Sequence, residues 1–488
     1  MCVRGRGSTG TYSACPHDLV RKVTEQGNPV TAQSAEAESG EGRGVLSASG
    51  PQGKAPHLRR NVLFGLVEVV SNTLLAFVSY WLMVRVGGIS MLGIWSTLVA
   101  SIGLGRLGDL GISGSTTRFV AALDARSECD KVCRYVDTGI LTNFAVILLL
   151  TAITTATVSN RLEFVVGHDA VSTARPALIW ISAAVLLAAL SSIILSSLVA
   201  LHRGFLRSCI TVGGNLLQLA LVFWLVPRHG LKGFAEAQVF QYGISAVIGW
   251  VAICHAVGRV RLPSAFSVAT LRQMLGFSLT LQVVNLVNGL LEPLSKLLVS
   301  HFGGMHIQGY YEAAYRFVFT ARNLASNTVA AALPALTRYA QTDVVRAREL
   351  YSAALRHTGR ALVLLLAAIL VGAPVLSFLW FRGIEWRFIA FVAVLSIGTT
   401  ASGWCTPAYL LGLALGRLRG IIVAMSASLG LMAIVGTAMG VLGQPDLIVA
   451  TMSLAMLTSS LIVVFLNEPL LGLNARFGPF QISRGRLM

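Results

Sequence analysis

The chain repeats itself at a distance of 216 residues, and this repeat constrains the fold more than any other feature. Nine of the 35 positions from Asn72 to Arg106 are identical in the second copy. Each copy joins two apolar segments through a Gly-Gly pair and places an arginine late in the second segment. Duplicated helical halves are a recurrent membrane architecture, so we predict two equivalent helical units. The matched pairs are Asn72 and Asn288, Leu74 and Leu290, Leu75 and Leu291, Ser79 and Ser295, Leu82 and Leu298, Gly87 and Gly303, Gly88 and Gly304, Gly93 and Gly309, and Arg106 and Arg322.

The composition predicts an all-α integral membrane protein. The 488 residues have a mean hydropathy of +0.71 and only 12% are charged, against about 25% in soluble proteins. Apolar stretches of roughly 20 residues, the length that crosses a bilayer as a helix, recur along the chain. We expect 12 transmembrane helices, at about 61–85, 90–115, 138–158, 177–201, 207–227, 233–257, 276–300, 308–336, 361–381, 387–411, 419–441 and 446–468.

The basic residues lie in alternate loops and predict the orientation. Of the 38 lysines and arginines, 27 lie in the tails and one set of loops, and seven lie in the other set. Because basic loops stay in the cytoplasm, we expect both termini there and the chain in the cell (inner or plasma) membrane. This accounts for the net charge of +17 without a nucleic-acid partner. We predict a disordered cytoplasmic tail (1–57), six-helix bundles (58–258 and 274–470) related by a pseudo-twofold axis along the membrane normal, a cytoplasmic linker (259–273) and a C-terminal cytoplasmic tail (471–488).

Charged residues fall inside the predicted helices, and those well away from the helix ends lie in the first two helices of each half. A charge at the centre of a membrane helix costs on the order of 3 kcal/mol, so such residues should face a cavity or a partner. Their clustering predicts one polar surface built from four helices. These residues are Glu68, Arg106 and Asp109 in the first half, and Glu292, Lys296, Glu312, Arg316 and Arg322 in the second.

The spacing of these charges leaves two interpretations open. Three pairs of opposite charge lie three or four residues apart, so each pair shares a helical face and would neutralise itself. Arg322 and Glu68 have no such partner one turn away and are the better functional candidates. Pro293 directly after Glu292 predicts a kink, which suits H⁺ or Na⁺ coupling or helix packing alone. The three pairs are Glu292 with Lys296, Glu312 with Arg316, and Arg106 with Asp109.

Sequence motifs of soluble enzymes do not occur in a meaningful context. The run from Gly103 to Gly108 has the letters of a dinucleotide-binding fingerprint but lacks the preceding strand, so we treat it as accidental. There is no Walker A, His-Glu-x-x-His or Gly-x-Ser-x-Gly motif, and the seven cysteines are scattered. We therefore expect no enzyme activity, no metal site and no bound cofactor.

Two parts of the repeat resemble a known family. The run from Glu292 to Arg316 is similar to the span 7–8 signature of the polysaccharide (O-antigen type) flippases. This family belongs to the multidrug/oligosaccharidyl-lipid/polysaccharide exporter superfamily. Gly93-Ile-Trp95 and Gly108-Asp-Leu-Gly-Ile112, followed by Arg118, resemble the matching signature of the first half, and Leu333-Pro-Ala-Leu336 fits the end of span 8.

The resemblance covers residues 58 to about 470 and implies a flippase that works by alternating access as an ion-coupled antiporter. Its substrate would be a polyprenyl-diphosphate-linked oligosaccharide of O-antigen or exopolysaccharide synthesis, and its partners membrane lipids and the pathway's polymerase and glycosyltransferases. One departure is Ser295, which stands where family members often carry an acid. Phosphates require fixed cations, for which arginine is well suited. The substrate-binding candidates are Arg106, Lys296, Arg316, Arg322 and Arg118, and the ion-coupling candidates are Glu292, Asp109, Glu68 and Glu312.

Two alternative functions remain open. A multidrug exporter of the same superfamily would move cationic amphiphiles and would need an acidic cavity. A membrane glycosyltransferase or polymerase would need a large loop outside the cytoplasm or a catalytic acid motif, and the longest such loop, at about 159–176, carries neither.

Overall fold

The computed structural model describes residues 55–105, 111–121, 123, 127–258, 261–330, 339, 343–415 and 418–467. These residues contain no strand, and nine of their helices are long and apolar enough to cross a membrane. The prediction of an all-α integral membrane protein is confirmed. Residues 1–54 and 468–488, Arg106, Asp109 and the segment 333–336 lie outside the described residues, so the predictions made for them are not tested.

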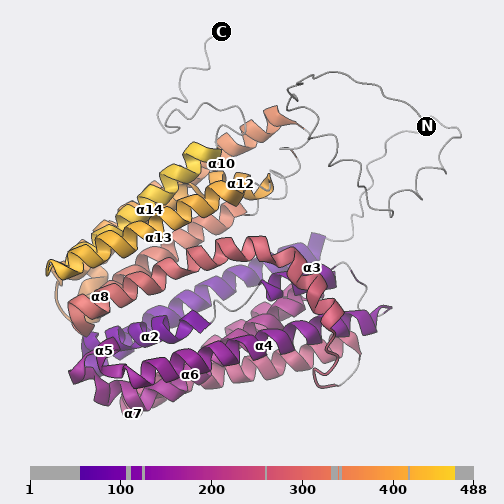
Figure 1. Cartoon of the computed structure of the whole chain (residues 1–488), viewed down its shortest axis with the longest axis horizontal. Helices are drawn as coiled ribbons and strands as arrows, with labels where there is room; N and C mark the ends of the chain where they lie inside the picture. The colour runs from indigo at the N-terminus through magenta and orange to yellow at the C-terminus, as the bar shows by residue number, and fades with distance from the viewer. Residues whose placement is uncertain are drawn as a thin grey trace, which may run out of the picture. The chain divides into compact units, whose positions relative to one another are not determined.

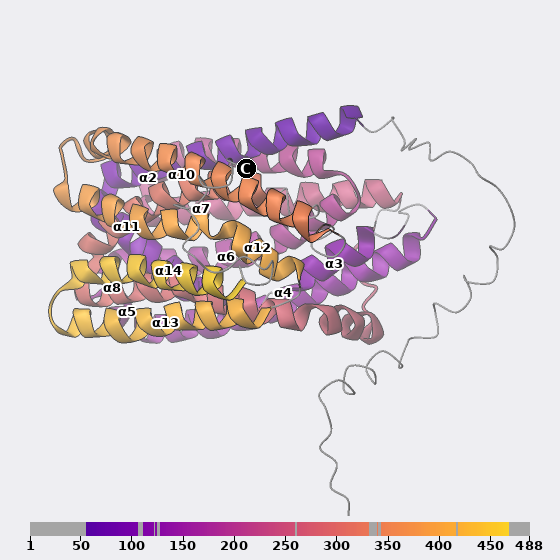
Figure 2. The same cartoon turned by 90° about the horizontal axis from the view of Figure 1, so that it is seen from above.

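The long helices lie side by side, as Figures 1 and 2 show from two directions. The helices α4, α6 and α7 pack together, and α8 packs against α11, α13 and α14. The helices are α2 (Ala55–Gly103), α3 (Ile112–Ala121), α4 (Cys129–Asn160), α5 (Leu162–Val166), α6 (Val171–Ala200), α7 (Gly204–Val257), α8 (Val268–Ala330), α10 (Val344–Phe381), α11 (Trp386–Trp404), α12 (Thr406–Ala414), α13 (Leu418–Val441) and α14 (Pro445–Asn467), with a 3₁₀ turn at His168–Ala170.

Three of these helices, α2, α7 and α8, are each interrupted by a glycine with a non-helical conformation. Gly88 and Gly304 have the same backbone angles, φ 73° and ψ 176°, and Gly230 has φ 57° and ψ −130°. Side chains rarely tolerate such angles, which is why glycine occupies these positions. The repeated Gly-Gly pair therefore forms the same backbone turn in both copies.

The two copies of the repeat meet through glycines that exchange equivalent contacts. A Cβ on Gly93 would collide with the carbonyl oxygen of Met305, and one on Gly309 would collide with the carbonyl oxygen of Ile89. Ile89 and Met305 are themselves 216 residues apart, like the two glycines. This reciprocal contact is what a local twofold axis produces, and it brings α2 and α8 together backbone to backbone as only small residues allow.

Several helices begin or end away from the predicted bounds. Helix α10 starts at Val344, well before the predicted 361–381. The Asp343 carboxylate caps this end, because it accepts hydrogen bonds from the backbone amides of Val345 and Arg346, both at 3.1 Å. Conversely, the second predicted helix, 90–115, is too long, since α2 ends at Gly103. Apolar stretches mark the part of a helix that lies in hydrocarbon, whereas caps and glycines decide where the helix itself stops.

The connection between α7 and α8 is anchored to α4. The fully buried Asp137 carboxylate accepts hydrogen bonds from the Arg261 guanidinium and from the backbone amides of Ser264 (3.1 Å) and Ala265 (3.0 Å). Burial alone would lower the pKa of Arg261, but its hydrogen bonds and ion pair with Asp137 hold that pKa above its ordinary value. Most of the predicted linker is thus fixed to the first half, and α8 already begins at Val268.

Candidate functional site

Lys296 lies between two carboxylates where α2 and α8 meet. Its Nζ is 2.7 Å from Oε1 of Glu292 and 2.8 Å from Oε2 of Glu312. Glu312 also accepts hydrogen bonds from the hydroxyls of Tyr80 (2.8 Å) and Ser96 (2.6 Å). The side chains of Lys296 and Glu312 are 8% and 2% exposed, whereas that of Glu292 is 48% exposed. The Glu312 carboxylate thus links both copies of the repeat, through the hydroxyls of Tyr80 and Ser96 in α2 and through Lys296 in α8.

Arg316 does not pair with Glu312, although the two lie one turn apart. No ion pair joins them within 4.0 Å, and Glu312 is instead paired with Lys296. The exposed Arg316 guanidinium donates two hydrogen bonds to the Tyr80 hydroxyl, at 3.1 and 3.3 Å, and lies 5.5 Å from the centre of the Tyr80 ring. Two of the three predicted ion pairs lie in the described residues. Of these, Glu292 with Lys296 forms, and Glu312 with Arg316 does not.

Within the described part of α8, the non-helical φ and ψ lie at Gly304, and Pro293 lies inside the helix, where a kink stays a prediction. Ser295, at the position where family members often carry an acid, bonds to the Tyr311 hydroxyl at 2.8 Å and donates to the Glu292 carbonyl at 2.8 Å. Ser295 is therefore fully engaged inside α8, and the acid that neutralises Lys296 from this segment is Glu292.

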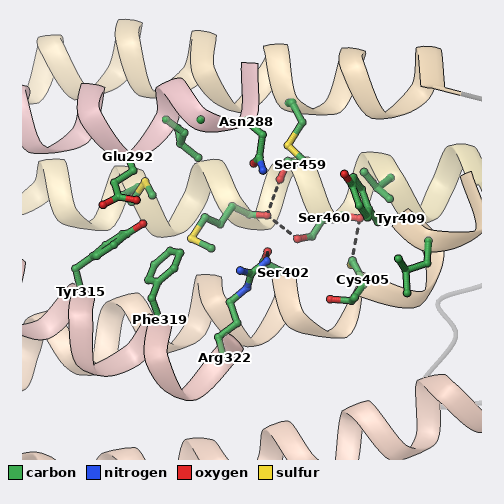
Figure 3. Close-up of a pocket in the computed structure, with 18 residues that line it drawn as sticks. Asn288, Glu292, Tyr315, Phe319, Arg322, Ser402, Cys405, Tyr409, Ser459 and Ser460 are labelled. Carbon is green, nitrogen blue, oxygen red and sulfur yellow. Dashed lines mark hydrogen bonds between the residues drawn. The ribbon is translucent and has the colours of Figure 1, made fainter. Parts of the chain in front are cut away.

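A cavity of about 500 Å³ adjoins this cluster and is lined by α8, α11, α12, α13 and α14. Arg322 projects from α8 into it, toward Ser402 (Figure 3). Its Nη2 donates to Ser402 Oγ at 2.8 Å, and its Nη1 to Asn323 Oδ1 at 3.5 Å. Its Nε is buried without a hydrogen-bond partner, and no carboxylate of the described residues lies within 4.0 Å. Arg322 is thus a membrane-embedded cation with unused hydrogen-bonding capacity, as the absence of a nearby acid in the sequence predicted.

The rest of the cavity wall is divided between polar and apolar surface. Glu292 and Tyr315 stand at one end of it (Figure 3), with the Glu292 carboxylate already bonded to Lys296. The charged residues of the wall are Glu292 and Arg322, and Arg322 lies apart from any carboxylate of the described residues. The apolar wall consists of Leu291, Leu410, Met425, Met452, Met456 and Val463.

The other predicted site residues lie elsewhere. Glu68 has no basic partner one turn away, but the fold gives it one from α7, where Arg207 approaches to 3.3 Å and the Ser208 hydroxyl donates at 2.7 Å. Arg118 is exposed on α3 and is not among the residues that line the cavity. Arg106 and Asp109 lie outside the described residues. The structure therefore groups Glu292, Lys296, Glu312, Arg316 and Arg322 along α8 and leaves Glu68 in a separate ion pair.

Sequence reasoning missed three polar residues of the site. Tyr80 and Ser96 are the repeat equivalents of Lys296 and Glu312, since each pair is 216 residues apart. Comparing the two copies for polar residues, and not only for identities, would have found both. Ser402 carries no signal of its own in the sequence, because it is one of many serines in apolar helices.

Comparisons with known proteins agree with this fold. Residues 204–386 match the family model described as polysaccharide biosynthesis protein. An inward-facing multidrug resistance MATE family transporter of the MOP superfamily matches with a TM-score of 0.66 and 14% identity, over 83% of this chain and 95% of its own. The lipid II flippase MurJ, in an inward closed conformation, matches with a TM-score of 0.64 and 14% identity, over 83% of this chain and 87% of the MurJ chain. A MOP superfamily transporter from Pyrococcus furiosus matches with a TM-score of 0.61 and 12% identity, over 85% of this chain and 95% of the transporter chain. Comparison with curated protein sequences gives no match.

The chain therefore has the fold of the flippases and exporters of the MOP superfamily. Residues 204–386 carry the sequence pattern of the polysaccharide biosynthesis family. The predicted resemblance to the polysaccharide flippases is confirmed by these matches.

Proposed function

We propose that this protein flips a polyprenyl-diphosphate-linked oligosaccharide from the inner to the outer leaflet of the cell membrane by alternating access. The observation that carries the proposal is Arg322, a cation in a membrane cavity with no described carboxylate beside it. Keeping such a charge in the membrane costs on the order of 3 kcal/mol. A diphosphate would offset that cost, because guanidinium groups bind phosphate oxygens through paired hydrogen bonds. The polysaccharide biosynthesis family match and the flippase fold support this substrate class.

The cations of α8 would act at different stages of transport. Arg322 is open to the cavity and is our candidate for the first headgroup contact. Arg316 is exposed where the two copies meet, and it would bind the headgroup as the copies separate. Lys296 is engaged by two carboxylates and would reach substrate only after they release it. Arg106 and Arg118 remain predicted contacts.

Transport against a gradient needs a coupled ion, and the acids around Lys296 are our candidates for binding H⁺ or Na⁺. Glu292 is half exposed and lines the cavity, so ions and protons can reach it. Glu312 is buried and bonded to both copies, so a change in its charge would loosen the contact between them. Glu68 and Asp109 stay predicted coupling residues without contacts to this group.

Alternating access also implies an arrangement in the membrane. We propose that α2, α7 and α8 each cross twice, with a turn at the interrupting glycine, which gives 12 crossings in two six-helix bundles. The bundles would span 58–258 and 274–470, with both termini in the cytoplasm of a cell-membrane protein. The polymerase and glycosyltransferases of the pathway would be its partners.

A cation-coupled multidrug exporter is the second candidate, because a MATE transporter is among the structures that share the fold. The positive Arg322 would repel the cationic amphiphiles that such an exporter moves, and this favours the flippase. A glycosyltransferase or polymerase is the weakest candidate, since the three solved structures described above are transporters or flippases and not enzymes.

The proposal is tested by transport in proteoliposomes that contain the full chain and a fluorescent polyprenyl-diphosphate disaccharide. Flipping is measured as the fraction of probe that an impermeant quencher reaches over time. Arg322→Gln should slow the initial rate by about tenfold or more, because a charge-assisted contact is lost, and Arg322→Lys should retain part of the rate. Arg272→Gln, at an exposed arginine on the same helix, is the matched control and should match the wild type.

Two results would count against the flippase. One is an unchanged flipping rate in Arg322→Gln. The other is a wild-type protein that accumulates a cationic dye while leaving the lipid-linked probe in place, which would favour the exporter.

A further inference from the structure

A long groove runs along the surface of the first half, between α4 and α6. Its volume is about 770 Å³, and it is separate from the Arg322 cavity, since the two share no lining residue. Each helix contributes one face, over residues 148–159 of α4 and 175–186 of α6. Eleven residue steps at 1.5 Å per step give a length of about 16 Å. This is about half of the 30 Å hydrocarbon core of a bilayer, and therefore the depth of one leaflet.

The wall of the groove is suited to hydrocarbon. Small side chains such as Ala152, Ala156 and Ala183 open space between the two helices. The hydroxyls of Thr155 and Ser182 lie 2.7 Å apart and form a hydrogen bond with each other across the groove, so an apolar ligand leaves neither hydroxyl without a partner. Both helices are candidate membrane spans, so we place the groove against lipid tails.

One end of the groove carries a positive charge at the level of the membrane surface. Arg175 lies near the start of α6, just after the polar connection from α4, whose Glu163 and His168 side chains are 71% and 87% exposed. Glu163 lies 3.6 Å from His168. Arg175 is exposed, and within the described residues no carboxylate lies within 4.0 Å of it. An apolar channel one leaflet deep with an arginine at its polar end is complementary to a phospholipid.

We propose that this groove is a binding site for one membrane phospholipid, with an acyl chain between α4 and α6 and its phosphate on Arg175. The guanidinium supplies paired donors for the phosphate oxygens, and the chain fills a hollow that α4 and α6 leave between them. The site does not depend on the proposed flippase activity, because none of its residues lines the Arg322 cavity. Its expected role is to hold α4 and α6 together from the lipid side.

Native mass spectrometry of the full chain tests the site, with dioleoyl phosphatidylglycerol as the probe and dioleoylglycerol, which lacks the phosphate, as its match. The wild type should retain the phospholipid at least tenfold more tightly than the diglyceride, since one charge-assisted contact distinguishes them. Arg175→Gln should abolish that difference, and Arg175→Lys should keep part of it. Ala156→Phe, at an exposed alanine in the groove, should reduce binding of both lipids.

An exposed arginine that does not line the groove, Arg161, gives the control variant Arg161→Gln, which should bind as the wild type does. Equal retention of the phospholipid by wild type, Arg175→Gln and Ala156→Phe would overturn the proposal. So would a dimer of the chain that Ala156→Phe dissociates, because a second copy would then cover the groove.

Discussion

The two copies of the repeat have the same backbone turn but different chemistry. Gly88 and Gly304 share their φ and ψ, and the contacts of Gly93 and Gly309 mirror each other. At the side chains the copies differ, because Lys296 of the second copy corresponds to the neutral Tyr80 of the first. In the same way, Glu312 corresponds to Ser96. The second copy supplies the described charges of the polar cluster, and the first supplies hydroxyls that donate to them.

This difference has a physical reason. Equivalent residues that lie near a twofold axis come close together, so a symmetric pair of lysines or glutamates there would place like charges side by side in a medium that screens them poorly. At these two positions, charges in one copy and neutral hydroxyls in the other give both Lys296 and Glu312 a partner. The duplication therefore preserves the backbone turn and leaves Lys296 and Glu312 without charged equivalents in the first copy.

The largest expected effect comes from removing a charge of the second copy. Glu312→Gln should destabilise the fold by about 3–5 kcal/mol, because the buried Lys296 loses one of its two carboxylates. Thermal unfolding in detergent, followed by intrinsic fluorescence, measures the loss. A double variant that also replaces Lys296 with methionine should recover part of it, and failure to recover any stability would contradict the assigned pairing.

A smaller loss is expected where the copies meet. Gly93→Ala and Gly309→Ala should each cost about 1–3 kcal/mol, because each added Cβ collides with a backbone carbonyl that has little room to move. Equal losses would support the local twofold axis. The matched controls are Gly213→Ala and Gly430→Ala, where an added Cβ meets nothing within 4 Å. Unequal losses at Gly93 and Gly309 would break the symmetry.

The turns themselves test the backbone equivalence without any packing contribution. An added Cβ at Gly88 or Gly304 has no neighbour within 4 Å, so Gly88→Ala and Gly304→Ala report backbone strain alone. Each should lower the free energy of unfolding by about 1–2 kcal/mol, since alanine rarely adopts a φ near 73°. The same unfolding assay applies, and a loss at only one of the two would show that the turns are not equivalent.

The smallest effect is expected from a change to a neutral side chain of the first copy. Ser96→Ala removes one hydrogen bond from Glu312 but leaves those from Lys296 and Tyr80, so it should cost about 1 kcal/mol. Isothermal unfolding in a mixed-detergent denaturant series resolves a change of this size. A loss as large as that of Glu312→Gln would mean that the two copies contribute equally to the stability of this cluster.

The sequence predicted what depends on local spacing. The repeated glycines located the two equivalent turns, and the missing acid one turn from Arg322 predicted a cation without a partner, which the described residues show. The spacing of Glu312 and Arg316 was misleading, because Lys296 from the preceding segment of α8 reaches that carboxylate. Likewise, the partner of Glu68 comes from α7, 139 residues further along the chain. Such pairings depend on tertiary packing, and helical periodicity shows only which residues of a single helix share a face.

The two copies meet at Gly93 and Gly309, and we propose that they separate there during transport. Ser90 and His306 follow the contacting residues and are equivalent by the repeat, so spin labels on Ser90→Cys and His306→Cys in a background without the native cysteines report the contact directly. Pulsed dipolar spectroscopy should give one short distance without ligand and a second, longer population when a polyprenyl-diphosphate glycan is added. A single distance that the ligand leaves unchanged would contradict the account.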